Sequence, residues 1–335
     1  MRFWNIRTSS AVAAAATMVL AAGCSSGSSG GTAATTGKLE TTHITVDAFG
    51  AIDSAGLWIA QAEGLFAKQG LTVTINPGTS TQTLVNNQLS GKADISTGDY
   101  VTYIQDELQG TPLRIIAEAS FLQPNVLTLL VPPGSKVTSI NALKGKTISV
   151  NAPNDIGTLL VDSLLTEHGI PRRDVNINSN VAFPNVAKAF QTGATNVAFA
   201  PEPFVSLFAQ GGGVQELTDL DQGATSNFPI QGYAVTQQWA TAHPNTLKAF
   251  LTALRQGQQV ADTNRGAVET AIEKNLGLTP AQAALVSLPN FPVSLDPTRL
   301  QRVVDDLKQF NLFSSLPQVN QKLQTFQISR MIING

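Results

Sequence analysis

The sequence predicts an α/β protein made of two lobes, with additional helices at its C-terminal end. Two observations support this prediction. The chain has 335 residues, which is too long for one ordinary hydrophobic core, and from Thr41 onwards short β-branched runs alternate with helical patterns. The chain carries 21 basic and 23 acidic residues and contains no basic block, so we do not expect it to bind nucleic acid.

The first 23 residues differ from the rest of the chain. Arg2 and Arg7 precede Ala11 to Ala22, a run of almost entirely small and apolar residues, and this pattern is typical of a secretory signal. The run is too short for a membrane-spanning helix, which requires roughly 20 apolar residues. The sequence therefore predicts an exported protein with a signal peptide over residues 1–23.

Cys24 is the single cysteine of the chain and directly follows this segment. It has no second cysteine with which to form an intrachain disulfide, and Ser25 to Gly31 cannot build a core around it. The stretch Leu20 to Cys24 resembles the lipobox of a bacterial lipoprotein, which implies acylation of Cys24. We expect a lipid anchor on the extracytoplasmic face of the cell membrane, with residues 24–38 as a flexible tether.

The first lobe is predicted from the pattern that follows the tether. His43–Phe49 is an expected strand, and Ala55–Gln69 is an expected helix that ends at Gly70 because glycine readily takes the left-handed conformation. The alternation continues with expected strands at 71–75, 92–97, 113–120 and 125–133, and with expected helices at 81–91 and 100–110.

A second set of α/β elements follows. Strands are expected at 146–152, 196–203 and 232–236, and helices at 157–169 and 185–193. Beyond Trp239 the pattern is helical, and residues 243–264 show the apolar spacing of an amphipathic helix. We expect two chain crossings between the lobes, near Leu129–Val137 and Ile230–Thr236. The predicted lobes are therefore residues 39–131 with 235–335 for the first, and residues 132–234 for the second.

No combination of side chains in the sequence favours catalysis or metal binding. The three histidines, His43, His168 and His243, are far apart and have no evident partners. Leu143 to Thr147 is similar to the end of a phosphate-binding loop, but position 140 is isoleucine where that motif requires glycine. We therefore expect no catalytic residue, no metal and no cofactor.

Polar or glycine-containing loops recur where a predicted strand ends and the next helix begins. In open α/β sheets ligands bind at the carboxyl ends of the strands, where helix N-termini present free N–H groups. Simple helix capping would explain any one of these loops, but five in equivalent places predict a ligand site in the cleft between two lobes. The five loops are Gly50–Gly56, Pro77–Gln82, Ser96–Tyr100, Ala152–Thr158 and Ala200–Phe204.

Four segments together resemble the solute-binding proteins of ABC importers, in particular the group for nitrate, alkanesulfonates, taurine and the thiamin pyrimidine precursor. They are Gly56–Ile75, Gly91–Tyr100, Ile140–Val150 and Ala234–Leu254. The resemblance extends over about residues 41–310. It implies a type II periplasmic-binding-protein fold that closes around one small solute, and delivery of that solute to a permease with a separate ATPase. We expect the protein to be a monomer.

Carried over by matching segments, the resemblance also implies which residues contact the solute. They are Ser54, Thr79, Ser80, Thr81, Asp99 and Tyr100 from the first lobe, and Ile156, Gly157, Thr158 and Glu202 from the second. The five loops also carry Asp53, Asp99, Asp155 and Glu202 and no lysine or arginine. A bare anion would be repelled by these carboxylates, so a zwitterion or a nitrogen heterocycle is favoured.

Two alternatives to the binding protein remain open at this point. An enzyme of the same fold could act on a thiamin pyrimidine precursor, although the export signal and the absence of reactive side chains disfavour it. A sensor would present its closed form to a receptor domain, and the sequence contains no such fused domain.

Overall fold

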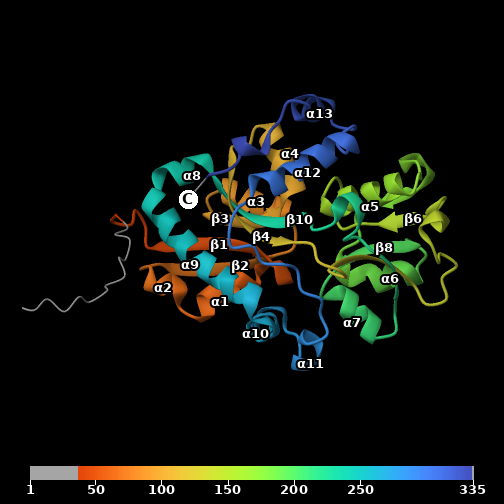
Figure 1. The fold of residues 1–335 in the computed structure, drawn as a ribbon, viewed down its shortest axis with the longest axis horizontal. Helices are drawn as coiled ribbons and strands as arrows, with labels where there is room; N and C mark the ends of the chain where they lie inside the picture. Colours follow the sequence, from red (N-terminus) through yellow and green to blue (C-terminus); the bar gives the residue numbers. More distant parts are fainter. Residues whose placement is uncertain (1–36, 334–335) are drawn as a thin grey trace, which may run out of the picture. The chain divides into compact units, whose positions relative to one another are not determined.

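A computed structural model describes residues 37–333 (Figure 1). The predicted signal peptide, Cys24 and nearly all of the predicted tether lie outside these residues. The described residues belong to one compact unit and contain two five-stranded sheets. None of the helices in this part of the chain combines the length and the apolar character needed to cross a membrane.

The first sheet combines parallel strands with one antiparallel strand. In spatial order its strands are β2 (Thr72–Gly78), β1 (His43–Phe49), β3 (Ile95–Asp99), β10 (Pro229–Thr236) and β4 (Leu113–Phe121). Strand β1 runs parallel to β2 and β3, whereas β10 is antiparallel to β3 and β4. The parallel strands therefore place their carboxyl ends, and the loops that follow, at one edge of the sheet.

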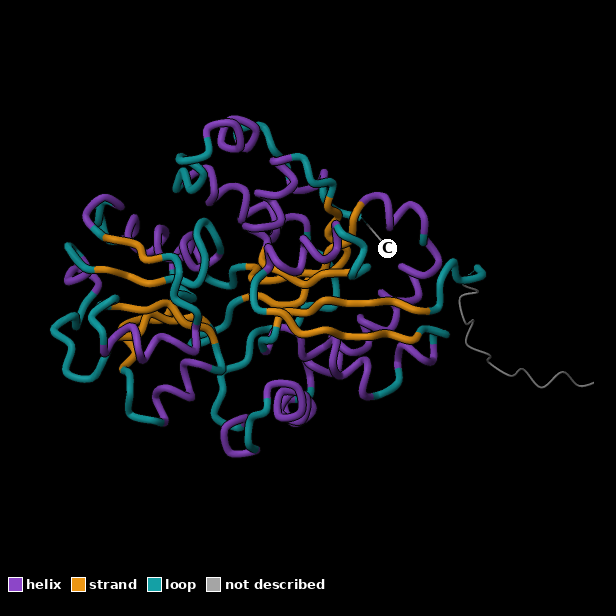
Figure 2. The backbone as a smooth tube through the Cα atoms, turned by 180° about the vertical axis from the view of Figure 1, so that it is seen from behind, coloured by secondary structure: helices purple, strands orange, loops and turns teal. Residues whose placement is uncertain are grey.

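The second sheet repeats this arrangement. Its order is β7 (Asn176–Asn178), β6 (Thr147–Ser149), β8 (Val197–Pro201), β5 (Leu127–Val131) and β9 (Gln215–Asp219). Strand β6 runs parallel to β7 and β8, and β5 is antiparallel to β8 and β9. The chain enters the second sheet at β5 and returns to the first sheet at β10. Each of these two strands runs antiparallel to its neighbours. Figure 2 shows the two groups of strands, each flanked by helices.

Helices cover both sheets and extend beyond them at the C-terminal end. Those between the strands are α1 (Ala55–Ala62), α2 (Leu65–Lys68), α3 (Thr81–Leu89), α4 (Tyr100–Gln109), α5 (Ile156–Glu167), α6 (Val186–Gln191) and α7 (Phe204–Gln210). Those after the last strand are α8 (Gln237–Ala242), α9 (Pro244–Thr263), α10 (Arg265–Leu276), α11 (Pro280–Ala283), α12 (Pro297–Gln309) and α13 (Pro317–Leu323). The single helix predicted over 55–69 is two helices, because Gly64 takes a left-handed conformation with φ 65° between them.

The predicted positions of the two crossings are wrong. The chain passes between the sheets at residues 122–126 and 220–228, rather than at Leu129–Val137 and Ile230–Thr236. Strands β5 and β10 are buried along nearly their whole length, so their apolar sequences suit either sheet. Only pairing with strands distant in sequence decides their place. The predicted boundaries therefore placed β5 in the first lobe and most of β10 in the second, whereas β5 belongs to the second sheet and β10 to the first.

Two strands of the second sheet, β7 and β9, were not expected from the sequence. Both are exposed or half-buried along their length. Strand β7 has only three residues and β9 has a single apolar residue, Leu217, so neither shows the longer alternation of apolar and polar residues by which a strand is recognised in a sequence.

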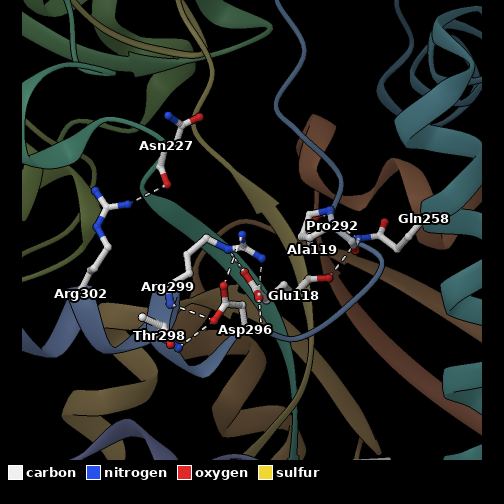
Figure 3. A network of polar contacts seen from close by, with 9 residues as sticks. All are labelled: Glu118, Ala119, Asn227, Gln258, Pro292, Asp296, Thr298, Arg299 and Arg302. Atoms are coloured by element: carbon white, nitrogen blue, oxygen red, sulfur yellow. Dashed lines mark hydrogen bonds and ion pairs between the residues drawn. The ribbon is translucent and has the colours of Figure 1, made fainter.

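Helix α12 contacts the ends of both crossings (Figure 3). Arg299 forms two hydrogen bonds with the buried carboxylate of Glu118 on β4, Nε to Oε2 at 2.8 Å and Nη2 to Oε1 at 3.0 Å. Its guanidinium also lies 4.7 Å from the ring centre of Phe121, directly before the first crossing. Arg302 donates to the carbonyl oxygens of Ala224, Ser226 and Asn227 in the second crossing. Helix α12 therefore ties the second crossing to strand β4 of the first sheet, at the point where the first crossing begins.

Helices α1 and α9 approach one another closely because glycines lie at their contact. A Cβ added to Gly257 on α9 would clash with the carbonyl oxygen of Gly56 on α1, and it would lie 2.8 Å from Ala60 Cβ. We expect Gly257→Ala to lower the free energy of unfolding by about 1–3 kcal/mol, the usual cost of overpacking a core.

Urea denaturation measures this change in stability, and Gly266→Ala is the matched control. Gly266 is exposed near the start of α10, and its added Cβ would meet only Asn264 Oδ1 at 3.5 Å. The free energy of unfolding of this variant should be unchanged or should rise by up to about 1 kcal/mol, because alanine has a higher helix propensity than glycine. Equal stability of Gly257→Ala and wild type would contradict the proposed packing of α1 on α9.

Candidate functional site

A cavity of about 230 Å³ lies between side chains carried by both sheets. Loops that follow β1, β2, β3 and β6 form much of its wall, at the carboxyl ends of these strands. Its polar lining residues are Asp53, Ser80, Thr81, Gln82, Asp99, Thr102, Gln105, Asn151, Asn154, Asp155 and Gln231. The cavity therefore occupies the kind of position that the loop pattern predicted.

Four of the ten predicted contact residues line this cavity: Ser80, Thr81, Asp99 and Ile156. Ser80 caps α3 by accepting a hydrogen bond from Thr83 N at 3.3 Å. The Thr81 hydroxyl donates to Asp99 Oδ2 at 2.7 Å, and this bond joins the loops after β2 and β3. These residues lie at the cavity because each one stands at the first turn of a helix whose N-terminus faces it.

Five other predicted residues lie beside the cavity lining rather than in it. Ser54 is fully buried and donates to Phe49 O at 2.8 Å, whereas Thr79 is exposed. Tyr100 is fully buried with its ring against Gly232, Gly157 lies against the ring of Phe199, and Thr158 is bonded to Asp155. Successive residues of a helix point about 100° apart. Where a helix begins at the cavity, therefore, only some of its first residues face the cavity.

Glu202, the tenth predicted residue, contacts another part of the protein. Its Oε1 accepts hydrogen bonds from Ser206 Oγ at 2.6 Å and from Ser287 N at 2.9 Å, and its Oε2 accepts one from Ser206 N at 3.0 Å. These bonds connect the start of α7 with the segment that follows α11. Glu202 therefore joins two structural elements and does not line the cavity.

Three carboxyl groups that line the cavity are more than nine-tenths buried: Asp53, Asp99 and Asp155. Both oxygens of Asp99 are occupied, because Oδ1 accepts from Thr102 N at 2.9 Å and Oδ2 from the hydroxyls of Thr81 and Thr102. Asp155 Oδ1 accepts from Thr158 N at 3.1 Å. Asp53 Oδ1 accepts from the Ser120 hydroxyl.

The remaining oxygens of two of these groups are free. Among the described residues, no donor of another residue is hydrogen-bonded to Oδ2 of Asp53 or to Oδ2 of Asp155. Asp53 comes from the turn after β1 and Asp155 from the turn after β6. Each sheet therefore contributes one carboxylate oxygen that has no partner.

The pKa values of all three groups are raised. Burial is the main cause for the carboxyls of Asp53 and Asp99, whose pKa values lie above their ordinary range despite hydrogen bonds to Ser120 and Thr102. Burial, followed by the negative charge of Asp99, raises the pKa of Asp155 to about 7. The Asp155 carboxyl therefore changes its charge closer to neutral pH than an exposed aspartate does.

Three amide side chains at the cavity were not predicted. Gln105 Oε1, Asn151 Oδ1 and Gln231 Oε1 are buried and have no hydrogen-bond partner in the described structure. Asn151 was not predicted as a contact residue because it lies within the strand predicted at 146–152. Gln231 could have been noticed as a polar residue inside the otherwise apolar strand β10, because a buried polar group normally has a partner.

Aromatic side chains complete the wall. Phe49, Phe183 and Phe199 line the cavity, and the rings of Phe183 and Phe199 meet edge to face with 6.0 Å between their centres. The residues that line the cavity include no lysine, arginine, histidine or cysteine. The arrangement offers hydrogen-bond acceptors and flat apolar surfaces, which suit binding. No group of His, Cys, Asp and Glu side chains suited to a metal ion occurs within residues 37–333.

A comparison with family models finds a match over more than half of the chain. Residues 51–264 match the model described as NMT1/THI5 like. The chain belongs to this family.

Individual relatives are more distant. The chain is 24% identical over 258 residues to YtlA of Bacillus subtilis (strain 168), which is named as a binding protein, and the match covers 72% of this chain and 76% of YtlA. It is 22% identical over 214 residues to the 4-amino-5-hydroxymethyl-2-methylpyrimidine phosphate synthase of Uromyces fabae, covering 60% of this chain and 61% of that enzyme.

A solved structure confirms the predicted fold. The alkanesulfonate-binding protein SsuA from Xanthomonas axonopodis pv. citri, bound to MOPS, matches with a TM-score of 0.72 at 16% identity. The match covers 89% of this chain and 100% of SsuA. The family member described here therefore has the two-lobe periplasmic-binding-protein fold that the sequence predicted.

Proposed function

We propose that this NMT1/THI5-like protein is the extracytoplasmic solute-binding subunit of an ABC importer. It captures a small polar solute, of the sulfonate, taurine, nitrate or pyrimidine-like kind, between its two lobes. It then delivers that solute to a permease driven by a separate ATPase. The observation that carries the proposal is the cavity, because its polar wall comes from both sheets and, within residues 37–333, two crossings connect these sheets. Such a site can close by rotation about the crossings.

The named relatives support this function. YtlA is named as a binding protein and SsuA as an alkanesulfonate-binding protein. We further propose that the protein acts as a monomer without a cofactor, and that acylated Cys24 holds it at the membrane close to its permease. Residues 24–38 would then be the tether between the anchor and the lobes.

An enzyme is the second candidate, because one relative is a pyrimidine phosphate synthase. The Asp155 carboxyl, with its pKa raised to about 7, would suit general acid–base work at neutral pH. The cavity lining nevertheless contains no histidine, cysteine or lysine to act as nucleophile beside it. We therefore favour binding without chemistry.

A thermal-shift screen followed by calorimetry tests the proposal with taurine, alkanesulfonates, nitrate, pyrimidines and amino acids. We expect one solute to bind and to be recovered unchanged. Asn151→Ala should weaken its binding by about ten-fold, since Asn151 Oδ1 is a buried acceptor that lacks a partner until a ligand arrives.

Asn176→Ala is the control, because Asn176 is exposed on β7 and lies outside the cavity lining. Equal affinity in the Asn151→Ala variant and wild type would mean that the solute binds elsewhere. Conversion of the solute to a product would favour the enzyme.

A further inference from the structure

We infer that the solute carries a positively charged hydrogen-bond donor, such as an ammonium, an amidinium or a protonated ring nitrogen, which binds between Asp53 and Asp155. This inference rests on the proposed function and names the chemical class of the solute. It follows from the charges at the cavity, from the free acceptor atoms and from the way the helix N-termini are capped.

The charges at the cavity have one sign. Asp53, Asp99 and Asp155 line it, and its lining contains no basic side chain. An anion placed there would meet like charges in a setting largely removed from water, which costs several kcal/mol. A cation would neutralise carboxylates that have no ion-pair partner in the described structure.

The free acceptors lie on both sides of the cavity. Asp53 is 8% exposed and Asp155 is 4% exposed, and the described hydrogen bonds leave one oxygen of each without a donor. The unpaired amide oxygens of Gln105, Asn151 and Gln231 add three further acceptors. Buried polar atoms are normally bonded, and the three amide oxygens are buried. Together with the two carboxylate oxygens they indicate a ligand rich in N–H groups that contacts both lobes at once.

The helix N-termini at the cavity carry side-chain caps. A helix N-terminus attracts an anion, but here a side-chain oxygen beside each N-terminus already accepts the N–H of the third helical residue. Ser80 accepts from Thr83 N in α3, Asp99 from Thr102 N in α4, and Asp155 from Thr158 N in α5. Two of these three caps are themselves carboxyl groups. A sulfonate or nitrate at these N-termini would therefore lie next to side-chain oxygens, two of which belong to carboxyl groups.

The aromatic wall suits the same class of solute. Phe49, Phe183 and Phe199 line the cavity together with the acidic groups. A planar cation gains from contact with aromatic faces in a desolvated site. Flat amidinium or aminoheterocycle groups therefore suit both the acidic and the aromatic part of the wall better than a tetrahedral anion does.

Three compounds of matched shape test the inference in the full-length protein: benzamidinium, benzamide and benzoate. They differ in charge but hardly in size. We expect benzamidinium to bind at least about ten-fold more tightly than benzamide, and benzoate to show no binding at millimolar concentration. Failure of benzamidinium to bind at millimolar concentration, or equal or tighter binding of benzoate, would overturn the inference.

Charge-removing variants locate the cation. Asp53→Asn and Asp155→Asn each keep an oxygen for the bonds from Ser120 and Thr158, so folding should be retained, and each should weaken benzamidinium binding by about ten-fold or more. Asp305→Asn is the control because Asp305 is exposed on α12. Unchanged benzamidinium affinity in both cavity variants would overturn the inference.

The proposed function and the charge preference can fail separately. If nitrate, an alkanesulfonate without an amino group, or benzoate binds and Asn151→Ala weakens that binding, the binding function stands and the inference of a cationic solute is wrong. If a bound compound is converted to a product, the binding function itself is wrong, whichever charge the compound carries.

Discussion

Replacing Arg299 by alanine is expected to lower the free energy of unfolding by about 3–5 kcal/mol, as is usual when one member of a buried ion pair is removed. The Glu118 side chain is fully buried, and Arg299 supplies two of the three hydrogen bonds that its carboxylate accepts. The third comes from Asp296 N at 2.6 Å. The variant would leave a buried carboxylate with one donor, and it would also lose the contact with the Phe121 ring.

Chemical denaturation of three proteins separates charge from packing. The double variant Glu118→Gln/Arg299→Met removes both charges and keeps similar volumes, so it should recover most of the lost stability. Burial raises the pKa of Glu118 even with Arg299 present, so the loss in Arg299→Ala should shrink as the pH falls and Glu118 becomes protonated. A loss below about 1 kcal/mol at neutral pH would show that the pair does not anchor α12 as described.

Replacing Asp155 by asparagine is expected to stabilise the unliganded protein above pH 7. The pKa of Asp155 rises from 3.8 to about 7 on folding, so between these values the folded protein holds a proton that the unfolded chain has lost. Stability therefore falls as the pH rises from about 4 to about 7. The whole loss amounts to about 4 kcal/mol, at about 1.4 kcal/mol for each pKa unit.

The measurement is the free energy of unfolding at pH 5 and at pH 8, without ligand. Wild type should lose more stability than Asp155→Asn between these values, and the variant should be the more stable protein at pH 8. Asparagine keeps the cap on Thr158 N, so loss of the cap should not mask the effect. Asp305→Asn is the control, because Asp305 is exposed. Its stability should depend on pH in the same way as that of wild type. Identical pH profiles for Asp155→Asn and wild type would refute the buried, uncompensated charge at this position.

The sequence predicted the parts of this fold that depend on local patterns. Strand His43–Phe49 and helix Tyr100–Gln109 are found where apolar spacing and a terminal glycine indicated them. The crossings could not be placed from local patterns, because β5 and β10 are buried in sheets formed with partners far away in sequence. Short exposed strands such as β9 give no pattern at all.

The same limit applies to the candidate site. Ser80 and Asp99 could be predicted because they precede helices and cap them. Glu202 stands in an equivalent loop, but its partner Ser287 is 85 residues away, and no local signal shows that contact. Asn151 was missed because an unpaired amide is recognisable only once its surroundings are known.

Native mass spectrometry of the protein with its best-binding solute tests the central claim most directly. We predict one solute bound per chain, at lower occupancy in the Asn151→Ala variant than in Asn176→Ala, and released on denaturation with its mass unchanged. Release of a compound with a different mass, or equal retention of the solute by both variants, would contradict the conclusion that this protein captures a solute in the cavity between its lobes.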